Sequence, residues 1–159
     1  MTLQEGDVVE DVEATLCDGE TFRSRQLSAA LGERGAVLVS TGLVYSAIAR
    51  NWWKRFERYG WGEFDGVPVL GFSRDGPYAQ NAFLRELEEP PFRFFADVDG
   101  RITDALGVRT EREGMAGIST PRRAVFVLDS EREVEYAYVA EDWISPLPHE
   151  DMEAAVAEL

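Results

Sequence analysis

The sequence predicts an α/β fold in which a central mixed β-sheet is flanked by helices and preceded by an N-terminal β-hairpin. Three observations predict it. Short apolar runs alternate with segments of helical spacing, a pair of strands joined by a tight polar turn closes the alternation, and 159 residues suit one hydrophobic core. We therefore expect one domain over residues 1–159.

The first half of the chain predicts a hairpin, a short helix, a buried strand and a longer helix. An Asp-Gly pair at 18–19 indicates the hairpin turn. The continuous apolar run at 36–40 is typical of a strand buried on both faces, and the longer helix repeats apolar residues at helical spacing. In order, the expected elements are strands 12–16 and 20–23, helix 24–31, strand 36–40 and helix 46–59.

The second half continues the alternation. The Asp-Gly-Pro turn at 75–77 is expected to start a helix after an apolar strand. In order, we expect strand 67–73, helix 78–87, strand 92–96, a short helix 101–106, strands 123–129 and 133–139, and helix 149–159. Because chemistry in α/β sheets is found where buried strands end and helices begin, residues 41–50 form the decisive junction.

The charge of the chain argues against two classes of partner. Asp and Glu number 30 against 16 Lys and Arg, so the formal net charge is −14. Such an acidic field opposes binding to nucleic acid or to an anionic membrane. The composition, with Lys54 as the one lysine, resembles that of proteins from salt-loving archaea. The N-terminus has neither a basic start nor an apolar stretch, so we expect a cytoplasmic protein without a membrane span.

Cysteine and histidine each occur once, at Cys17 and His149. One cysteine cannot form an internal disulfide, and this pair cannot build a zinc site, so we expect no metal and no cofactor. The acidic neighbours Asp18 and Glu20 should raise the pKa of the Cys17 thiol, which favours an incidental turn residue over a nucleophile. His149 follows a proline, and a helix-start or surface position is favoured over a catalytic triad.

Seven segments in order resemble the peroxiredoxin family, also called alkyl hydroperoxide reductase/thiol-specific antioxidant proteins. Among them, 67–75 reads Val-Pro-Val-Leu-Gly-Phe-Ser-Arg-Asp and 123–129 reads Arg-Ala-Val-Phe-Val-Leu-Asp. The full set is 12–19, 25–28, 67–75, 82–83, 92–100, 105–108 and 123–129. The resemblance covers nearly the whole chain and implies a thioredoxin-like fold.

The family's catalytic loop has the pattern Pro-x-x-x-Thr/Ser-x-x-Cys after the first core strand. Aligned on that strand, the proline, hydroxyl and cysteine positions fall on Gly42, Ser46 and Ala49. A glutamate often found three residues after the cysteine falls on Trp52, and the distant active-site arginine is matched by Arg123. Of the loop positions, this chain keeps only the hydroxyl.

The resemblance therefore implies a site without its nucleophile. Peroxide reduction needs a thiolate, and alanine supplies none. We expect that thiol peroxidase activity is lost and that a pocket lined by Tyr45, Ser46, Ala49 and Arg123 binds a small anionic or peroxide-like ligand, or a protein partner. The alternative roles are structural, because Ser46 suits the N-cap of the following helix and Arg123 could pair with a carboxylate.

Two other hypotheses stay open. The chain could be an active peroxidase in which the cysteine was exchanged for Ala49 in the laboratory, although the further departures at Gly42 and Trp52 favour natural loss. It could also be a structural or regulatory homo-oligomer, with a homodimer expected by analogy to peroxiredoxin-like folds. An aromatic cluster could form such a contact if exposed, although burial is favoured. Its members are Trp52, Trp53, Phe56, Tyr59 and Trp61.

Overall fold

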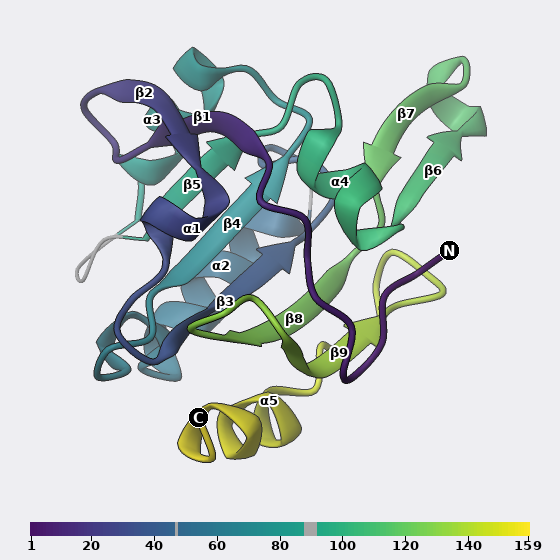
Figure 1. Cartoon of the computed structure of the whole chain (residues 1–159). Coiled ribbons are helices and arrows are strands. Elements are labelled where there is room, and N and C mark those ends of the chain that lie inside the picture. Colours follow the sequence, from purple (N-terminus) through teal and green to yellow (C-terminus); the bar gives the residue numbers. More distant parts are fainter. Residues whose placement is uncertain (47, 88–91) are drawn as a thin grey trace.

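The computed structural model describes residues 1–46, 48–87 and 92–159, and a twisted seven-stranded sheet of order β2-β1-β5-β4-β3-β8-β9 lies at their centre (Figure 1). β3, β4 and β5 are parallel neighbours, while β1, β2, β8 and β9 join by antiparallel pairing. The mixed sheet and the N-terminal hairpin are therefore confirmed. Its strands are β1 (Glu13–Cys17), β2 (Phe22–Gln26), β3 (Gly35–Ser40), β4 (Val69–Ser73), β5 (Arg93–Ala96), β8 (Ala124–Asp129) and β9 (Val134–Val139).

Helices cover both faces of the sheet, because the strands at its centre are apolar on both sides. In β3, Val37 and Val39 face one core with α2, α3 and α5, and Ala36 and Leu38 face the other with α1 and α4. None of these helices is long and apolar enough to cross a membrane. The helices are α1 (Leu27–Ala30), α2 (Ala49–Arg58), α3 (Pro77–Leu84), α4 (Arg101–Leu106) and α5 (His149–Ala157), with short 3-10 turns η1 (Trp61–Glu63) and η2 (Glu113–Met115).

The predicted helix over residues 24–31 is wrong in its first three residues. Ser24, Arg25 and Gln26 continue β2 and pair with Thr15, Ala14 and Glu13 of β1. Only four residues, Leu27–Ala30, are left for α1. The hairpin ladder satisfies the backbone of this polar stretch, and cross-strand pairing overrides its local propensity.

A second hairpin, which the sequence pattern did not predict, lies between α4 and β8. Its strands β6 (Arg109–Arg112) and β7 (Ile118–Pro121) pair with each other in a separate two-stranded sheet. The arm projects beyond α4, away from the central sheet (Figure 1). It delivers Arg112 and Pro121 to the edge of the sheet where β3 ends.

Candidate functional site

The loop after β3 and the start of β8 lie side by side. β3 ends at Ser40, which pairs with Ala124, so Arg123 stands next to the first residues of that loop. The loop leads to α2, whose Trp52 ring centroid is 5.5 Å from the guanidinium carbon of Arg123. The fold thus brings Arg123 beside the helix that begins at Ala49.

The side chain of Arg123 is buried without a hydrogen bond to any residue that the structure describes. Its exposed fraction is 0%, and Nε, Nη1 and Nη2 have no hydrogen-bond acceptor within the described part of the chain. The nearest carboxylate is that of Asp142, whose Oδ1 lies 3.8 Å from Nη1 and whose side chain is 52% exposed. Burial lowers the pKa of Arg123, and Asp142 opposes this shift. The site therefore holds a desolvated cation with unused donors.

Trp52 adds another unused donor beside this cation. Its buried Nε1 has no acceptor among the described residues, whereas Nε1 of the neighbouring Trp53 donates to Thr41 Oγ1 at 3.2 Å. Trp52 stacks on Phe56 and lies under Arg55. The unused polar groups of Arg123 and Trp52 are all N–H donors. The site therefore suits a ligand that only accepts hydrogen bonds.

Ala49 is the first residue of α2 and is fully buried. The predicted start of this helix at Ser46 is therefore three residues early. The Ala49 N–H donates to the carbonyl oxygen of Ser46 at 3.1 Å and lies 3.3 Å from its Oγ, while the Ser46 hydroxyl donates to the Leu43 carbonyl at 3.1 Å. The N-cap of α2 is Ile48 and no side chain caps the helix, so the prediction that Ser46 is the N-cap is wrong. The Ser46 hydroxyl instead braces the turn that precedes the helix.

Tyr45 contacts a different group of residues. Its hydroxyl donates to Glu86 Oε2 at 2.8 Å, its ring packs edge-on against Phe83, and Arg50 pairs with the same Glu86 at 3.0 Å. Burial and the Glu86 carboxylate raise the pKa of Tyr45. In the described residues its polar contact is to this surface cluster, while Arg123 contacts Trp52 and Asp142.

Two residues that the sequence analysis did not single out cover the loop at Gly42. A Cβ atom added to Gly42 would lie 3.0 Å from Cζ3 of Trp143, and the backbone there has φ +94°. The guanidinium carbon of Arg112, from β6, stands 3.6 Å above the Trp143 ring. Because glycine has no side chain, position 42 leaves space for the Trp143 ring. This glycine is the one sequence signal that could have indicated the contact.

The aromatic cluster after Ala49 lies mostly in the core. Trp52, Trp53, Phe56 and Trp61 are all at most 5% exposed, and Phe56 stacks on Trp61 with centroids 4.1 Å apart. The burial interpretation is confirmed for these four side chains. They do not offer the exposed face that a dimer contact would need.

His149 begins a helix as predicted, whereas Cys17 is the last residue of β1 and not a turn residue. Cys17 is buried, and burial first and Asp18 second raise the pKa of its thiol to about 12. His149 begins α5, stacks on Tyr59 with centroids 4.1 Å apart and approaches Glu153 at 3.4 Å. The Cys17 thiol is protonated at neutral pH, and the His149 imidazole is held by a carboxylate and a ring.

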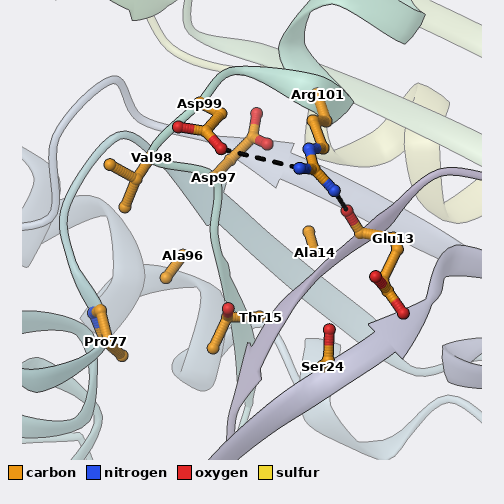
Figure 2. A pocket seen from close by; sticks show the side chains of 10 residues that line it. All are labelled: Glu13, Ala14, Thr15, Ser24, Pro77, Ala96, Asp97, Val98, Asp99 and Arg101. Carbon is orange, nitrogen blue, oxygen red and sulfur yellow. Dashed lines mark hydrogen bonds and ion pairs between the residues drawn. The ribbon is translucent and has the colours of Figure 1, made fainter.

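Figure 2 shows a hollow elsewhere on the molecule, between β1 and the segment that follows β5. Its volume is about 290 Å³. Arg101 donates to the Glu13 carbonyl and pairs loosely with Asp99 at 3.8 Å, while the Asp97 carboxylate accepts the N–H groups of Ile102 and Thr103. Its main charged groups therefore have partners inside the protein, and none of the predicted site residues line it.

One acidic group has the spacing of metal ligands. Carboxylate oxygens of Asp129, Glu133 and Glu135 lie within 4.8 Å of one another at the turn between β8 and β9. Oδ1 of Asp129 already accepts the backbone N–H groups of Glu131 and Glu133, so this carboxylate has a structural task in the turn. The expectation that the protein takes no metal stays a prediction.

Comparison with known proteins identifies the family. The AhpC/TSA family model matches residues 6–137. Among solved structures, Mycobacterium tuberculosis AhpC superimposes with a TM-score of 0.76 at 16% identity over 99% of both chains. Enterococcus faecalis AhpC gives 0.78 at 18% identity over 99% of this chain and 93% of that one.

The reduced 2-Cys peroxiredoxin of Plasmodium vivax gives a TM-score of 0.79 at 16% identity, over 98% of this chain and 82% of that one. No curated protein matches the chain. At these identities the structural likeness establishes the thioredoxin-like fold, and the family model adds the sequence match over most of the length. The chain therefore belongs to the AhpC/TSA family of peroxiredoxins.

Proposed function

We propose that this protein is a redoxin domain that has lost thiol peroxidase chemistry and that binds a small anion at Arg123. The observation that carries the proposal is the Arg123 guanidinium, which is fully buried and donates no hydrogen bond to any described residue. Leaving such a group unpaired costs several kcal/mol. A bound anion would remove that cost.

The proposed loss of peroxidase chemistry rests on the absence of a cysteine where the family keeps its nucleophile. Peroxide reduction requires a thiolate that attacks the O–O bond and becomes a sulfenic acid. We assign the nucleophile's place to Ala49, the first residue of α2. The remaining thiol, Cys17, is buried with a pKa of about 12, so it supplies almost no thiolate at neutral pH.

An anion is the preferred ligand because the unused polar groups of Arg123 and Trp52 are hydrogen-bond donors. The guanidinium and the Trp52 indole offer only N–H groups, and a neutral peroxide would bring hydroxyl donors of its own that need acceptors. The ligand must also be small. Arg123 is sealed from solvent, and Trp52 lies against its guanidinium. An anion of a few atoms, such as formate, matches both conditions.

The binding test uses sodium formate and the fluorescence of the tryptophans, at constant ionic strength. We expect saturable quenching in the natural protein, because Trp52 lies 5.5 Å from the guanidinium. Arg123→Met should abolish it, while Arg58→Met, which removes an exposed cation of α2, should leave it unchanged. Equal responses from the natural protein and Arg123→Met would refute the anion site.

The chemical test restores the thiol. The natural protein should not consume hydrogen peroxide in the presence of dithiothreitol. Ala49→Cys should react only slowly, because Gly42 and Trp52 stand where the family has its shielding proline and supporting glutamate. A revertant as fast as an ordinary peroxiredoxin would favour the alternative of a laboratory substitution, and a fast natural protein would overturn the proposal.

We also propose that the protein forms a homodimer, that it is cytoplasmic, and that it comes from a salt-tolerant organism. Light scattering at low and high potassium chloride measures self-association directly. The net charge of −14 makes the comparison informative, because salt screens the repulsion between copies of an acidic chain. A monomer at every salt concentration would count against the homo-oligomer hypothesis.

A further inference from the structure

A second basic site lies at the opposite edge of the central sheet from β9. β2 is the edge strand there and is paired with β1 alone. Arg23 lies opposite Leu16 and Arg25 opposite Ala14, so both arginines share one face of the hairpin. Phe95 of β5 also pairs with Leu16, and Arg93 precedes Phe95 by two residues, so it belongs to the same face.

These three arginines line one pocket of about 180 Å³, together with Leu16, Asp18 and Thr21. Three cations therefore face one carboxylate in a chain whose acidic residues outnumber the basic ones by 30 to 16. Local charge opposite to that of the whole molecule concentrates anions at this point of the surface. The pocket is independent of Arg123, which lies where β3 ends.

The single carboxylate is already in use. Asp18 accepts the N–H groups of Glu20 and Thr21 at 2.9 and 2.8 Å and the Thr21 hydroxyl at 3.2 Å. These bonds lower the pKa of Asp18 and direct its oxygens into the hairpin turn. Within residues 1–46, 48–87 and 92–159, no carboxylate lies within 4.0 Å of a nitrogen of any of the three arginines.

The remaining contacts of the arginines are weak backbone bonds. Arg93 reaches the Ala30 carbonyl at 3.4 Å and Arg25 the Ser24 carbonyl at 3.3 Å. Burial lowers the pKa of Arg93, and the charge of Asp18 opposes this shift. Most of the donors at this pocket are therefore free to bind a ligand.

We infer that the Arg23–Arg25–Arg93 pocket binds a tetrahedral oxyanion of the phosphate class. Each guanidinium is a planar fork of donors that matches the oxygens of a phosphate group, and three forks suit a dianion better than a monovalent carboxylate. The pocket is open at the sheet edge, so the group could be free phosphate or the end of a phosphate monoester.

The test is calorimetric titration with inorganic phosphate and, separately, with glycerol 2-phosphate, at constant ionic strength so that general screening is unchanged. We expect saturable binding of at least one of them, and the tighter of the two identifies the source. Arg23→Gln/Arg25→Gln should weaken binding by about tenfold or more, because two charged donors are removed.

Two further variants separate a site from general charge. Arg58→Gln removes an exposed cation that lies on α2, away from the pocket, and it should change the dissociation constant by less than about twofold. Arg93→Lys keeps the partly buried charge without the planar fork and should weaken binding less than the double variant does. The inference is overturned if neither phosphate compound binds saturably, or if Arg58→Gln weakens binding as much as the double variant.

Discussion

Asp97 and Arg123 are the two charged residues with buried side chains in the described parts of the chain, and the protein treats them in opposite ways. The Asp97 carboxylate accepts three hydrogen bonds, from the N–H groups of Ile102 and Thr103 and from the Thr103 hydroxyl, at 2.6 to 3.0 Å. The Arg123 side chain has a carboxylate at 3.8 Å and donates no hydrogen bond to the residues that the structure describes.

The hydrogen bonds of Asp97 indicate a structural role, whereas for Arg123 we propose a binding role. Asp97 caps the start of α4, where the free N–H groups of a helix need acceptors. Its burial is explained completely by contacts within the protein. Among the described residues, Arg123 has only the approach of Asp142 at 3.8 Å and the Trp52 ring at 5.5 Å, and this is the reason to look for a ligand there.

The largest effect is expected at Asp97. Asp97→Ala leaves two buried N–H groups of α4 without an acceptor, and it should lower the free energy of unfolding by about 3 kcal/mol. Asp97→Asn keeps an acceptor oxygen and should cost less. Urea denaturation measures both. A loss below about 1 kcal/mol in the alanine variant would mean that Asp97 is not the structural member of the pair.

Arg123→Met should have the opposite sign. Replacing a buried cation that has only a long ion pair with an apolar side chain of similar length should leave the free energy of unfolding unchanged or raise it by about 1 to 2 kcal/mol. The same urea titrations, in buffer without small carboxylates, provide the measurement. A loss of more than about 2 kcal/mol would show that the guanidinium stabilises the fold, and the contrast with Asp97 would disappear.

A smaller effect is expected from Asp142→Asn. The carboxylate is half exposed and its pairing with Arg123 is long, so the midpoint of thermal unfolding should change less than in Arg123→Met. Bonds from Ser145 and Ile144 lower the pKa of Asp142. Its contribution to stability is therefore present above the unfolded pKa of about 4 and is lost as the pH falls through the folded value, so the variant should flatten the acid side of the pH–stability curve.

The smallest effect on stability near neutral pH is expected from the Cys17 thiol. Because its pKa is raised to about 12, folded protein at pH 8 should not react with Ellman's reagent, and unfolding in urea should expose one thiol. The stabilisation is complete below the unfolded pKa of about 8.5 and is lost as the pH rises toward 12. Rapid labelling of the folded protein would restore Cys17 as a candidate nucleophile.

The sequence predicted the centre of this fold better than its margins. Residues 36–40 and 124–129 are apolar on both faces, so their strands could be recognised from composition alone. The polar Ser24, Arg25 and Gln26 carry no such signal, and only pairing with β1 makes them a strand. The arm of β6 and β7 was missed for the same reason, since its exposed, charged residues do not alternate with apolar ones.

At the site, the resemblance to peroxiredoxins predicted the importance of Arg123 but not its state. Whether a guanidinium is paired depends on the loop after β9, which brings Asp142 to 3.8 Å, and on α2, which brings Trp52 over it. These segments are far from Arg123 in the chain. Local pattern says nothing about where they meet, so the unpaired state was not predictable from sequence.

The backbone of Gly42 has a consequence for any attempt to rebuild the catalytic loop of the family. Its φ of +94° is closed to proline, whose ring fixes φ near −65°, and the Trp143 ring stands where a side chain would go. A reversal by Gly42→Pro would require this loop to refold and Trp143 to be displaced at the same time. Under the function proposed above, Ala49→Cys restores the thiol in one substitution, whereas a proline at position 42 would also need a changed backbone and a displaced Trp143 ring.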